Sequence, residues 1–208
     1  YTKGLSEASE RLMNLIDDIL DLSTIEAGYM TLEKSQVNIR EMLAGLYNLT
    51  VEWGRGQKIE VKLSCPDDIG FAELDERRIK QGLLNLVHNA IAYTPAGGQI
   101  TLAAAHLGGD VALSVIDTGP GIAAADHERI FRPFEKTSES RQIDGDGRGD
   151  GQGGAGLGLS LVKNIVDLHG GRIDLKSTPG TGSAFTLIIP ADGQASPASK
   201  ETPAKKTA

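Results

Sequence analysis

The chain has 208 residues, 39% of them hydrophobic, which is enough for one core with an attached segment. Its formal net charge of −7 argues against nucleic acid as a partner, because phosphate backbones attract clustered Lys and Arg. The single cysteine, Cys65, excludes an internal disulfide and a cysteine-based metal cage.

No apolar run approaches the ~20 residues that span a bilayer, so we expect a cytoplasmic protein with no membrane contact through this segment. The chain opens inside a helical pattern and without Met. We therefore expect a piece of a longer protein, and an inner-membrane anchor in that longer protein stays open.

The first predicted element is a helix over residues 5–27, followed by Gly28 as its C-cap. Its apolar residues recur at intervals of three and four, and a second stripe widens the apolar face. They are Leu5, Ala8, Leu12, Leu15, Ile19 and Leu22, with Met13, Ile16 and Leu20 in the second stripe. We expect Asp17, Asp18 and Asp21 in solvent on the opposite face. This pattern favours a homodimer through the helix, and packing on its own domain is the alternative.

A short extended stretch at 30–33 precedes a second helix, which begins at Asn38 with Glu41 in a capping pattern and is closed by Gly54 and Gly56. The later elements follow from alternation and helical periodicity. We predict strands at 59–63, 71–74, 100–105, 111–116, 172–176 and 184–189, and helices at 76–92, 126–130 and 160–168, with Asp75 capping the helix at 76–92.

Two segments carry no such pattern. Residues 135–153 are rich in Ser, Gly, Asp and Arg and predict a mobile loop, and residues 191–208 predict a disordered tail.

A glycine-rich turn, Gly153-Gly-Ala-Gly-Leu-Gly-Leu159, runs directly into the helix at 160–168. Glycines permit positive φ and close approach, and the first N–H groups of a helix have no partners within it. Such a junction suits a phosphate group, although glycine-rich turns also serve as plain connectors.

Asn85 and Asn89 lie one helical turn apart, with His88 beside them. Amide oxygens are suitable Mg²⁺ ligands when phosphates and water complete the shell. As surface residues they would need no explanation, but they lie among apolar positions, where an unpaired amide costs about 1–3 kcal/mol.

Asp117 follows an apolar strand and opens the turn Asp117-Thr-Gly-Pro-Gly121. A carboxylate there can accept hydrogen bonds from a base amine, while the glycines leave space for a flat ring. The same residues also suit an ordinary turn, and the two interpretations are compatible.

Five motifs in this order resemble those of sensor histidine kinases. They are Asn85-Leu-Val-His-Asn89 with Ala-Ile-Ala-Tyr-Thr-Pro95 (N box), Asp117-Thr-Gly-Pro-Gly121 (G1 box), Ile130-Phe-Arg-Pro-Phe134 (F box), Gly154-Ala-Gly-Leu-Gly158 (G2 box) and Gly180-Thr-Gly182. The resemblance covers about 5–190. It divides the chain into the second helix of a dimerisation and phosphoacceptor hairpin (1–28), a catalytic and ATP-binding domain (29–190) and the tail (191–208).

The resemblance implies an α+β two-layer sandwich, the Bergerat ATP-binding fold, with a mixed sheet and helices on one face. It implies that Asp117 binds the adenine amine, Asn89 coordinates Mg²⁺ and Asn85 lies near the phosphates of ATP. The other nucleotide-binding residues that it implies are Tyr93, Gly119, Gly121, Lys136, Gly154, Gly156, Leu157, Gly158 and Thr181. Asn85 and Lys136 are the implied catalytic residues, with Lys136 neutralising the phosphates.

The implied activity is transfer of the γ-phosphate of Mg-ATP to an acceptor side chain outside this chain, for relay to a response regulator receiver domain. The acceptor is histidine in the family and tyrosine in one kinase-like member; His88, His106, His127 and His169 all lie outside the acceptor helix. The hydrolysing relatives have a glutamate base where this chain has Asn85, which favours a kinase over an ATPase of the gyrase or mismatch-repair class.

The chain departs from the family pattern in three places, and two of them, Ala92 and the long loop at 135–153, favour another alternative, a pseudokinase that serves as an interaction platform for another sensor kinase. Ala92 replaces a frequent basic residue, Lys136 stands where Arg is common, and the loop at 135–153 is long. The loss of a charged hydrogen bond, worth about 1.5–3 kcal/mol, would weaken ATP binding.

Overall fold

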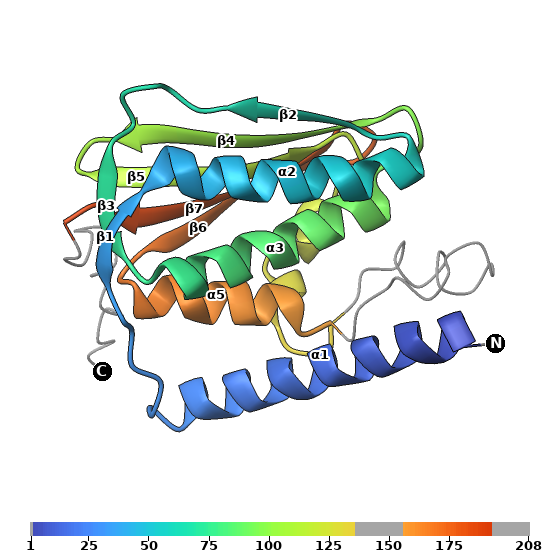
Figure 1. The fold of residues 1–208 in the computed structure, drawn as a ribbon, viewed down its shortest axis with the longest axis horizontal. Helices are drawn as coiled ribbons and strands as arrows, with labels where there is room; N and C mark the ends of the chain where they lie inside the picture. Colours follow the sequence, from blue (N-terminus) through green and yellow to red (C-terminus); the bar gives the residue numbers. More distant parts are fainter. Residues whose placement is uncertain (1, 136–155, 193–208) are drawn as a thin grey trace, which may run out of the picture.

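The computed structural model describes residues 2–135 and 156–192, without the side chains of residues 2–11 and 14. Helices cover one face of a sheet, and the N-terminal helix, α1, runs beside them (Figure 1). The elements are α1 (Thr2–Glu26), β1 (Ser35–Asn38), α2 (Ile39–Gln57), β2 (Glu60–Ser64), β3 (Phe71–Leu74), α3 (Glu76–Tyr93), β4 (Gln99–Leu107), β5 (Asp110–Asp117), the 3₁₀ turns η1 (Ala124–Asp126) and η2 (Arg129–Phe131), α5 (Gly158–Leu168), β6 (Arg172–Thr178) and β7 (Gly182–Pro190).

The main sheet has the strand order β2-β4-β5-β7-β6 and is mixed. β2 runs parallel to β4, and the other neighbouring strands are antiparallel. β1 and β3 form a separate antiparallel pair. This architecture confirms the predicted α+β two-layer sandwich.

The core lies between this sheet and helices α2, α3 and α5 (Figure 1). Alternate residues of the central strands are buried because successive side chains of a strand point to opposite faces. The buried set includes Ile100, Leu102, Val111, Leu113, Val115 and Leu187 from the strands and Met42, Leu43, Leu83, Leu86, Leu161 and Ile165 from the helices. The core therefore fixes α3 and α5 against the same sheet face.

Helix α2 corrects one prediction, because Gly54 and Gly56 lie inside it rather than closing it. The helix ends at Gln57, and Lys58 adopts the left-handed conformation (φ 58°) as its C-cap. At Gly54 a Cβ would lie 3.1 Å from Val61 Cγ2 and 3.2 Å from the Ile59 carbonyl oxygen. Gly54 thus allows close packing on β2.

Three boundaries also differ from the predictions. The first strand forms at Ser35–Asn38 rather than at 30–33, and the predicted helix at 126–130 is replaced by the two 3₁₀ turns. Ala191, assigned to the tail from the sequence, donates to the Gly109 carbonyl and accepts from the Glu73 N–H. The remaining predicted tail, 193–208, and most of the predicted loop, 136–153, lie outside the described residues.

Helix α1 packs along α5, with Leu22 buried and Leu15 and Ile25 against the core. Gly28 has φ 72° and completes the predicted C-cap, with hydrogen bonds from Gly28 N–H to Ile25 and from Tyr29 N–H to Thr24. The described residues of the predicted apolar face that stay exposed are Leu12, Met13, Ile16, Ile19 and Leu20. The side chains of Leu5 and Ala8 lie outside the description.

The acidic side of α1 corrects a second prediction. Asp21 is not in open solvent, because its carboxylate lies 2.9 Å from Arg78 Nη1 and its side chain is only 21% exposed. Asp18 is half-buried, and this burial, followed by the charges of Asp21 and Asp17, raises the pKa of its carboxyl group.

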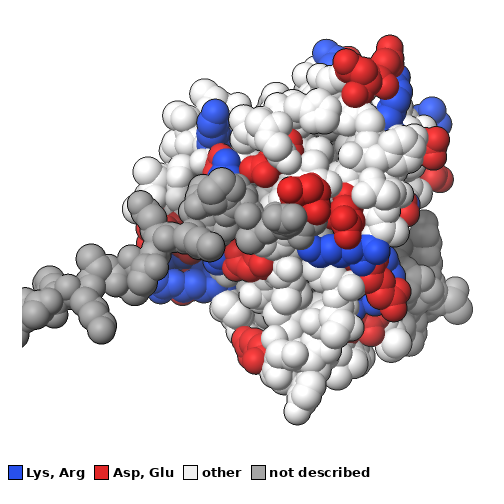
Figure 2. All heavy atoms as spheres, turned by 90° about the vertical axis from the view of Figure 1, so that its left-hand side faces the viewer, with Lys and Arg blue, Asp and Glu red and all other residues white. Residues whose placement is uncertain are grey.

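Charge is mixed on the surface that Figure 2 shows, the left-hand side of Figure 1: basic and acidic side chains lie next to one another there. In the part of the chain that the structure describes, no helix is long and apolar enough to cross a membrane.

Candidate nucleotide-binding site

One face of α3 carries three of the predicted site residues. Asn85, Asn89 and Tyr93 are spaced by four residues, so they lie in a row that extends about 12 Å along the helix axis. All three are partly buried. Asp75 fixes the start of this helix, because its carboxylate accepts the Arg78 N–H at 3.0 Å.

Asn85 has a buried amide nitrogen without a hydrogen-bond partner in the described structure. It faces the first residue of α5, since a Cβ at Gly158 would lie 3.5 Å from Asn85 Cγ. No side chain that the structure describes caps α5, so its N-terminus adds N–H donors and a partial positive charge. This junction can receive an anionic group such as a phosphate.

Asp117 is the last residue of β5, and the residue is buried. The Gly119 N–H donates to Asp117 Oδ1 at 2.8 Å, and the Ser183 backbone also donates to the carboxylate. Burial raises the pKa of Asp117, while these two hydrogen bonds act in the opposite direction. A carboxylate has about four lone-pair sites, so Asp117 can accept a further hydrogen bond from a ligand amine.

The turn after Asp117 requires glycine for steric reasons. A Cβ at Gly119 would lie 2.8 Å from Asp117 Oδ1 and 3.1 Å from the Tyr93 carbonyl oxygen. Gly121 has φ 75°, and a Cβ there would overlap the Thr178 carbonyl oxygen. These close approaches bring the turn against the end of α3 and against the β6–β7 loop.

Thr181 lies on that β6–β7 loop and is exposed. Its hydroxyl donates to the Thr178 carbonyl at 2.9 Å, while the Gly180 N–H donates to Pro120 at 2.6 Å. The loop thus rests on the Asp117 turn, although the Thr181 hydroxyl is already used within its own turn.

The G2 segment is described from Gly156 onward. The Gly156 carbonyl accepts the Phe134 N–H at 2.9 Å, which joins the F box to the start of α5. The Leu157 side chain is buried in the core, so only its backbone is available to a ligand. Lys136 and Gly154, both predicted site residues, lie outside the described residues.

The structure therefore brings the predicted residues together in two groups along α3. Asn85 faces Gly158 at α5, and Tyr93 meets Gly119 and the Asp117 turn, with Asn89 between them. No cluster of three His, Cys, Asp or Glu that could hold a metal occurs among the described residues. Asn89 offers one amide oxygen, a suitable Mg²⁺ ligand when phosphates and water complete the shell.

Two residues of the site were missed by sequence reasoning. The Ser183 backbone donates to Asp117, and Gly182 (φ 109°) has no room for a Cβ beside the Asp117 carbonyl oxygen. The Gly180-Thr-Gly182 motif signalled Gly182, but no local pattern indicates that Ser183 lies next to Asp117, 66 positions earlier in the chain.

Residues 74–193, more than half of the chain, match the family model described as histidine kinase-, DNA gyrase B-, and HSP90-like ATPase. The chain belongs to this family, and it is the ATP-binding, histidine-kinase-type domain of a two-component sensor kinase.

Among curated relatives, it is 36% identical over 190 residues to Sensor protein DivL of Caulobacter vibrioides, covering 91% of this chain and 23% of DivL. It is 33% identical to Histidine protein kinase DivJ of the same organism, covering 91% of this chain and 30% of DivJ. The chain thus spans less than a third of the length of these relatives.

Solved structures show the same fold. Full-length ShkA in complex with AMPPNP superposes with a TM-score of 0.79 at 30% identity, covering 95% of this chain and 39% of ShkA. Histidine kinase ThkA in complex with the response regulator protein TrrA superposes with a TM-score of 0.69 at 29% identity, covering 90% of this chain and 49% of that chain.

Proposed function

We propose that this domain binds Mg-ATP and transfers its γ-phosphate to a histidine or tyrosine on a hairpin helix outside this chain. The observation that carries the proposal is the buried Asn85 amide, which has no partner among the described residues and faces the N-terminus of α5, where no described side chain caps the helix. A buried amide without a partner costs about 1–3 kcal/mol, and a phosphate oxygen there would supply the missing acceptor.

The described residues fit ATP in three places. In this proposal the buried Asp117 carboxylate accepts a hydrogen bond from the adenine amine, the backbone of Gly156, Leu157 and Gly158 contacts the phosphates, and Tyr93, which meets the Asp117 turn, borders the nucleotide. Lys136 is proposed to add positive charge at the phosphates. When bound, Mg²⁺ would neutralise phosphate charge, and Asn89 is the residue that would hold it.

The side chains also favour transfer to a protein over hydrolysis. Asn85 occupies the position of the glutamate base in hydrolysing relatives, and an amide cannot remove a proton from water. Catalysis would therefore rest on positioning and on electrostatic stabilisation of the phosphates.

Partners are proposed on the same basis. The exposed apolar residues of α1 suit a second copy of the helix in a homodimer. A response regulator receiver domain is the proposed phosphate acceptor downstream, supported by the ThkA complex with TrrA.

A second candidate is an interaction platform that regulates another sensor kinase, with ATP binding weak or dispensable. Ala92 favours it, because this partly buried position on α3 lacks the positive charge that would attract a phosphate.

Calorimetric titration with a non-hydrolysable ATP analogue and Mg²⁺ separates the two candidates. We expect binding in the parent chain, and a loss of affinity of about 10- to 100-fold in Asn89→Ala and Asp117→Ala, from the loss of a charge-assisted contact. Asn48→Ala, an exposed asparagine on α2, is the matched control and should bind as the parent does. No binding at millimolar analogue would overturn the kinase proposal and leave the platform.

A further inference from the structure

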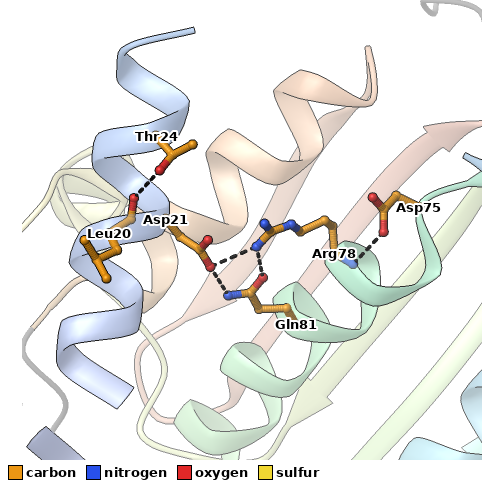
Figure 3. A network of polar contacts seen from close by, with 6 residues as sticks. All are labelled: Leu20, Asp21, Thr24, Asp75, Arg78 and Gln81. Atoms are coloured by element: carbon orange, nitrogen blue, oxygen red, sulfur yellow. Dashed lines mark hydrogen bonds and ion pairs between the residues drawn. The ribbon is translucent and has the colours of Figure 1, made fainter. Parts of the chain in front are cut away.

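A polar network joins α1 to the first turns of α3 (Figure 3). Asp21 Oδ2 accepts hydrogen bonds from Arg78 Nη1 at 2.9 Å and from Gln81 Nε2 at 2.7 Å. Arg78 Nη1 also donates to Gln81 Oε1 at 3.0 Å, so the two side chains of α3 hold each other in place. The carboxylate of α1 therefore meets a prepared pair of donors.

The burial of these groups distinguishes them from surface ion pairs. The side chains of Arg78 and Asp21 are 13% and 21% exposed, whereas those of the nearby pair Lys80 and Glu76 are 40% and 46% exposed. The attraction between two charges that are shielded from water is screened less by dissolved salt. Leu22, the residue after Asp21, is buried in the core, so the polar network lies next to an apolar contact of α1.

The connection between α1 and the domain reaches the same end of α3. Asp75 caps α3 through its Oδ1 atom, and its Oδ2 atom accepts the Glu33 N–H at 2.9 Å. Glu33 belongs to the segment that leads from α1 to β1. The start of α3 thus receives one contact from α1 and another from the segment behind it.

Helix α3 also carries the nucleotide-site row Asn85, Asn89 and Tyr93. Gln81 lies one turn before Asn85 on the same helix. A contact that fixes the first turns of α3 to α1 therefore fixes the position of the nucleotide site relative to α1, because a helix of this length moves as a rigid body.

We propose that Asp21, Arg78 and Gln81 form a latch, which holds the ATP-binding domain docked on α1 and whose opening lets the domain move about the segment 27–34. Its role in phosphate transfer rests on the proposed function, whereas the docking itself does not. The three residues are positioning residues: they set where the nucleotide site faces and make no contact with the nucleotide.

The test measures a distance within the chain. Spin labels are placed at Ser23→Cys on α1 and Asn48→Cys on α2, both exposed, in a Cys65→Ser background, and the labelled chain is diluted with unlabelled chain so that only distances within one chain are measured. The parent should give one narrow distance distribution.

Charge reversal at either end of the latch should release α1. We expect Asp21→Arg and Arg78→Asp each to raise the undocked population about ten-fold or more, seen as a broadened distribution. The double variant Asp21→Arg with Arg78→Asp should restore the narrow distribution. Asp17→Arg and Arg77→Asp, exposed neighbours on the same helices, should leave it narrow.

Narrow distributions in both single variants, or a double variant as broad as the singles, would overturn the latch. Titration with the ATP analogue supplies the second measurement: Asp21→Arg should bind within about two-fold of the parent, and a loss comparable to that of Asn89→Ala would overturn the positioning role. A parent that is narrow but binds no analogue would support the docking and refute the proposed function instead.

Discussion

His169 at the end of α5 accepts a hydrogen bond at Nε2 from the backbone N–H of Asp75, at 3.1 Å. Because Nε2 is the acceptor, Nδ1 carries the proton and donates to the Ile165 carbonyl at 2.7 Å. His169 is 1% exposed, so both bonds form inside the protein. The neutral imidazole therefore ties α5 to the residue that caps α3.

This histidine predicts a pH dependence of stability. Burial lowers the pKa of His169, and Lys34 adds to the lowering, while the hydrogen bond to Ile165 and the charge of Asp75 oppose it. As the pH falls, this histidine is therefore protonated in the unfolded chain before it is protonated in the folded protein. Its contribution to the free energy of unfolding is complete above the ordinary histidine pKa of about 6.5 and is lost progressively as the pH drops below that value.

Urea unfolding between pH 8 and 5.5 checks this. His169→Gln should reduce the decline and leave the part due to His88, whose pKa burial also lowers, whereas His106→Gln, at an exposed strand end, should keep all of it. An unchanged decline in His169→Gln would place its cause elsewhere.

Gly182 beside Asp117 should tolerate no side chain. Its φ of 109° is unfavourable for other residues, and a Cβ would overlap the Asp117 carbonyl oxygen. We expect Gly182→Ala to lower the free energy of unfolding by about 2–5 kcal/mol. Gly108→Ala is the control, with φ 63° and nothing within 4 Å, and should cost about 1–2 kcal/mol. Thermal unfolding of both variants compares the two, and equal losses would exclude the overlap as a cause.

Replacing Lys58 with glycine should stabilise the protein. It holds a left-handed conformation at the C-cap of α2, which costs a non-glycine residue about 1–2 kcal/mol. The greater conformational freedom of glycine in the unfolded chain offsets part of this gain. We therefore expect Lys58→Gly to raise the free energy of unfolding by about 0.5–1 kcal/mol. Lys58→Ala keeps the unfavourable conformation and should bring no gain in chemical denaturation. A gain of the same size in Lys58→Ala would assign the effect to the lysine side chain.

The exposed apolar face of α1 predicts self-association. Ile16 is 42% exposed, and a charge there would oppose burial against a second helix. We expect Ile16→Glu to shift the chain toward monomer in sedimentation equilibrium, with little change in the melting temperature of the domain. Leu49→Glu, at a similarly exposed apolar position on α2, should leave the association unchanged. A monomeric parent chain would contradict the homodimer.

Local patterns were sufficient for most elements and for the helix caps at Asn38 and Asp75. They failed at Gly54, where glycine in a sequence signals a helix end but in the structure permits close packing on Val61. They failed again at Asp21, because an acidic residue opposite an apolar stripe is expected in solvent unless a distant cation faces it. No local pattern shows that Arg78, 57 positions later, is that cation.

The candidate site divides in the same way. The sequence by itself determined which candidate site residues each element carries. These are the asparagines of α3, the carboxylate at the end of β5 and the glycines that lead into α5, and they could be found because each motif depends on short spacings within one element. Only the tertiary structure decided that Asn85 faces Gly158 with no partner among the described residues, and that the Asp117 turn rests against Tyr93. Such contacts join segments far apart in the chain, and the packing of α3 and α5 on one sheet face, rather than any local preference, brings them together.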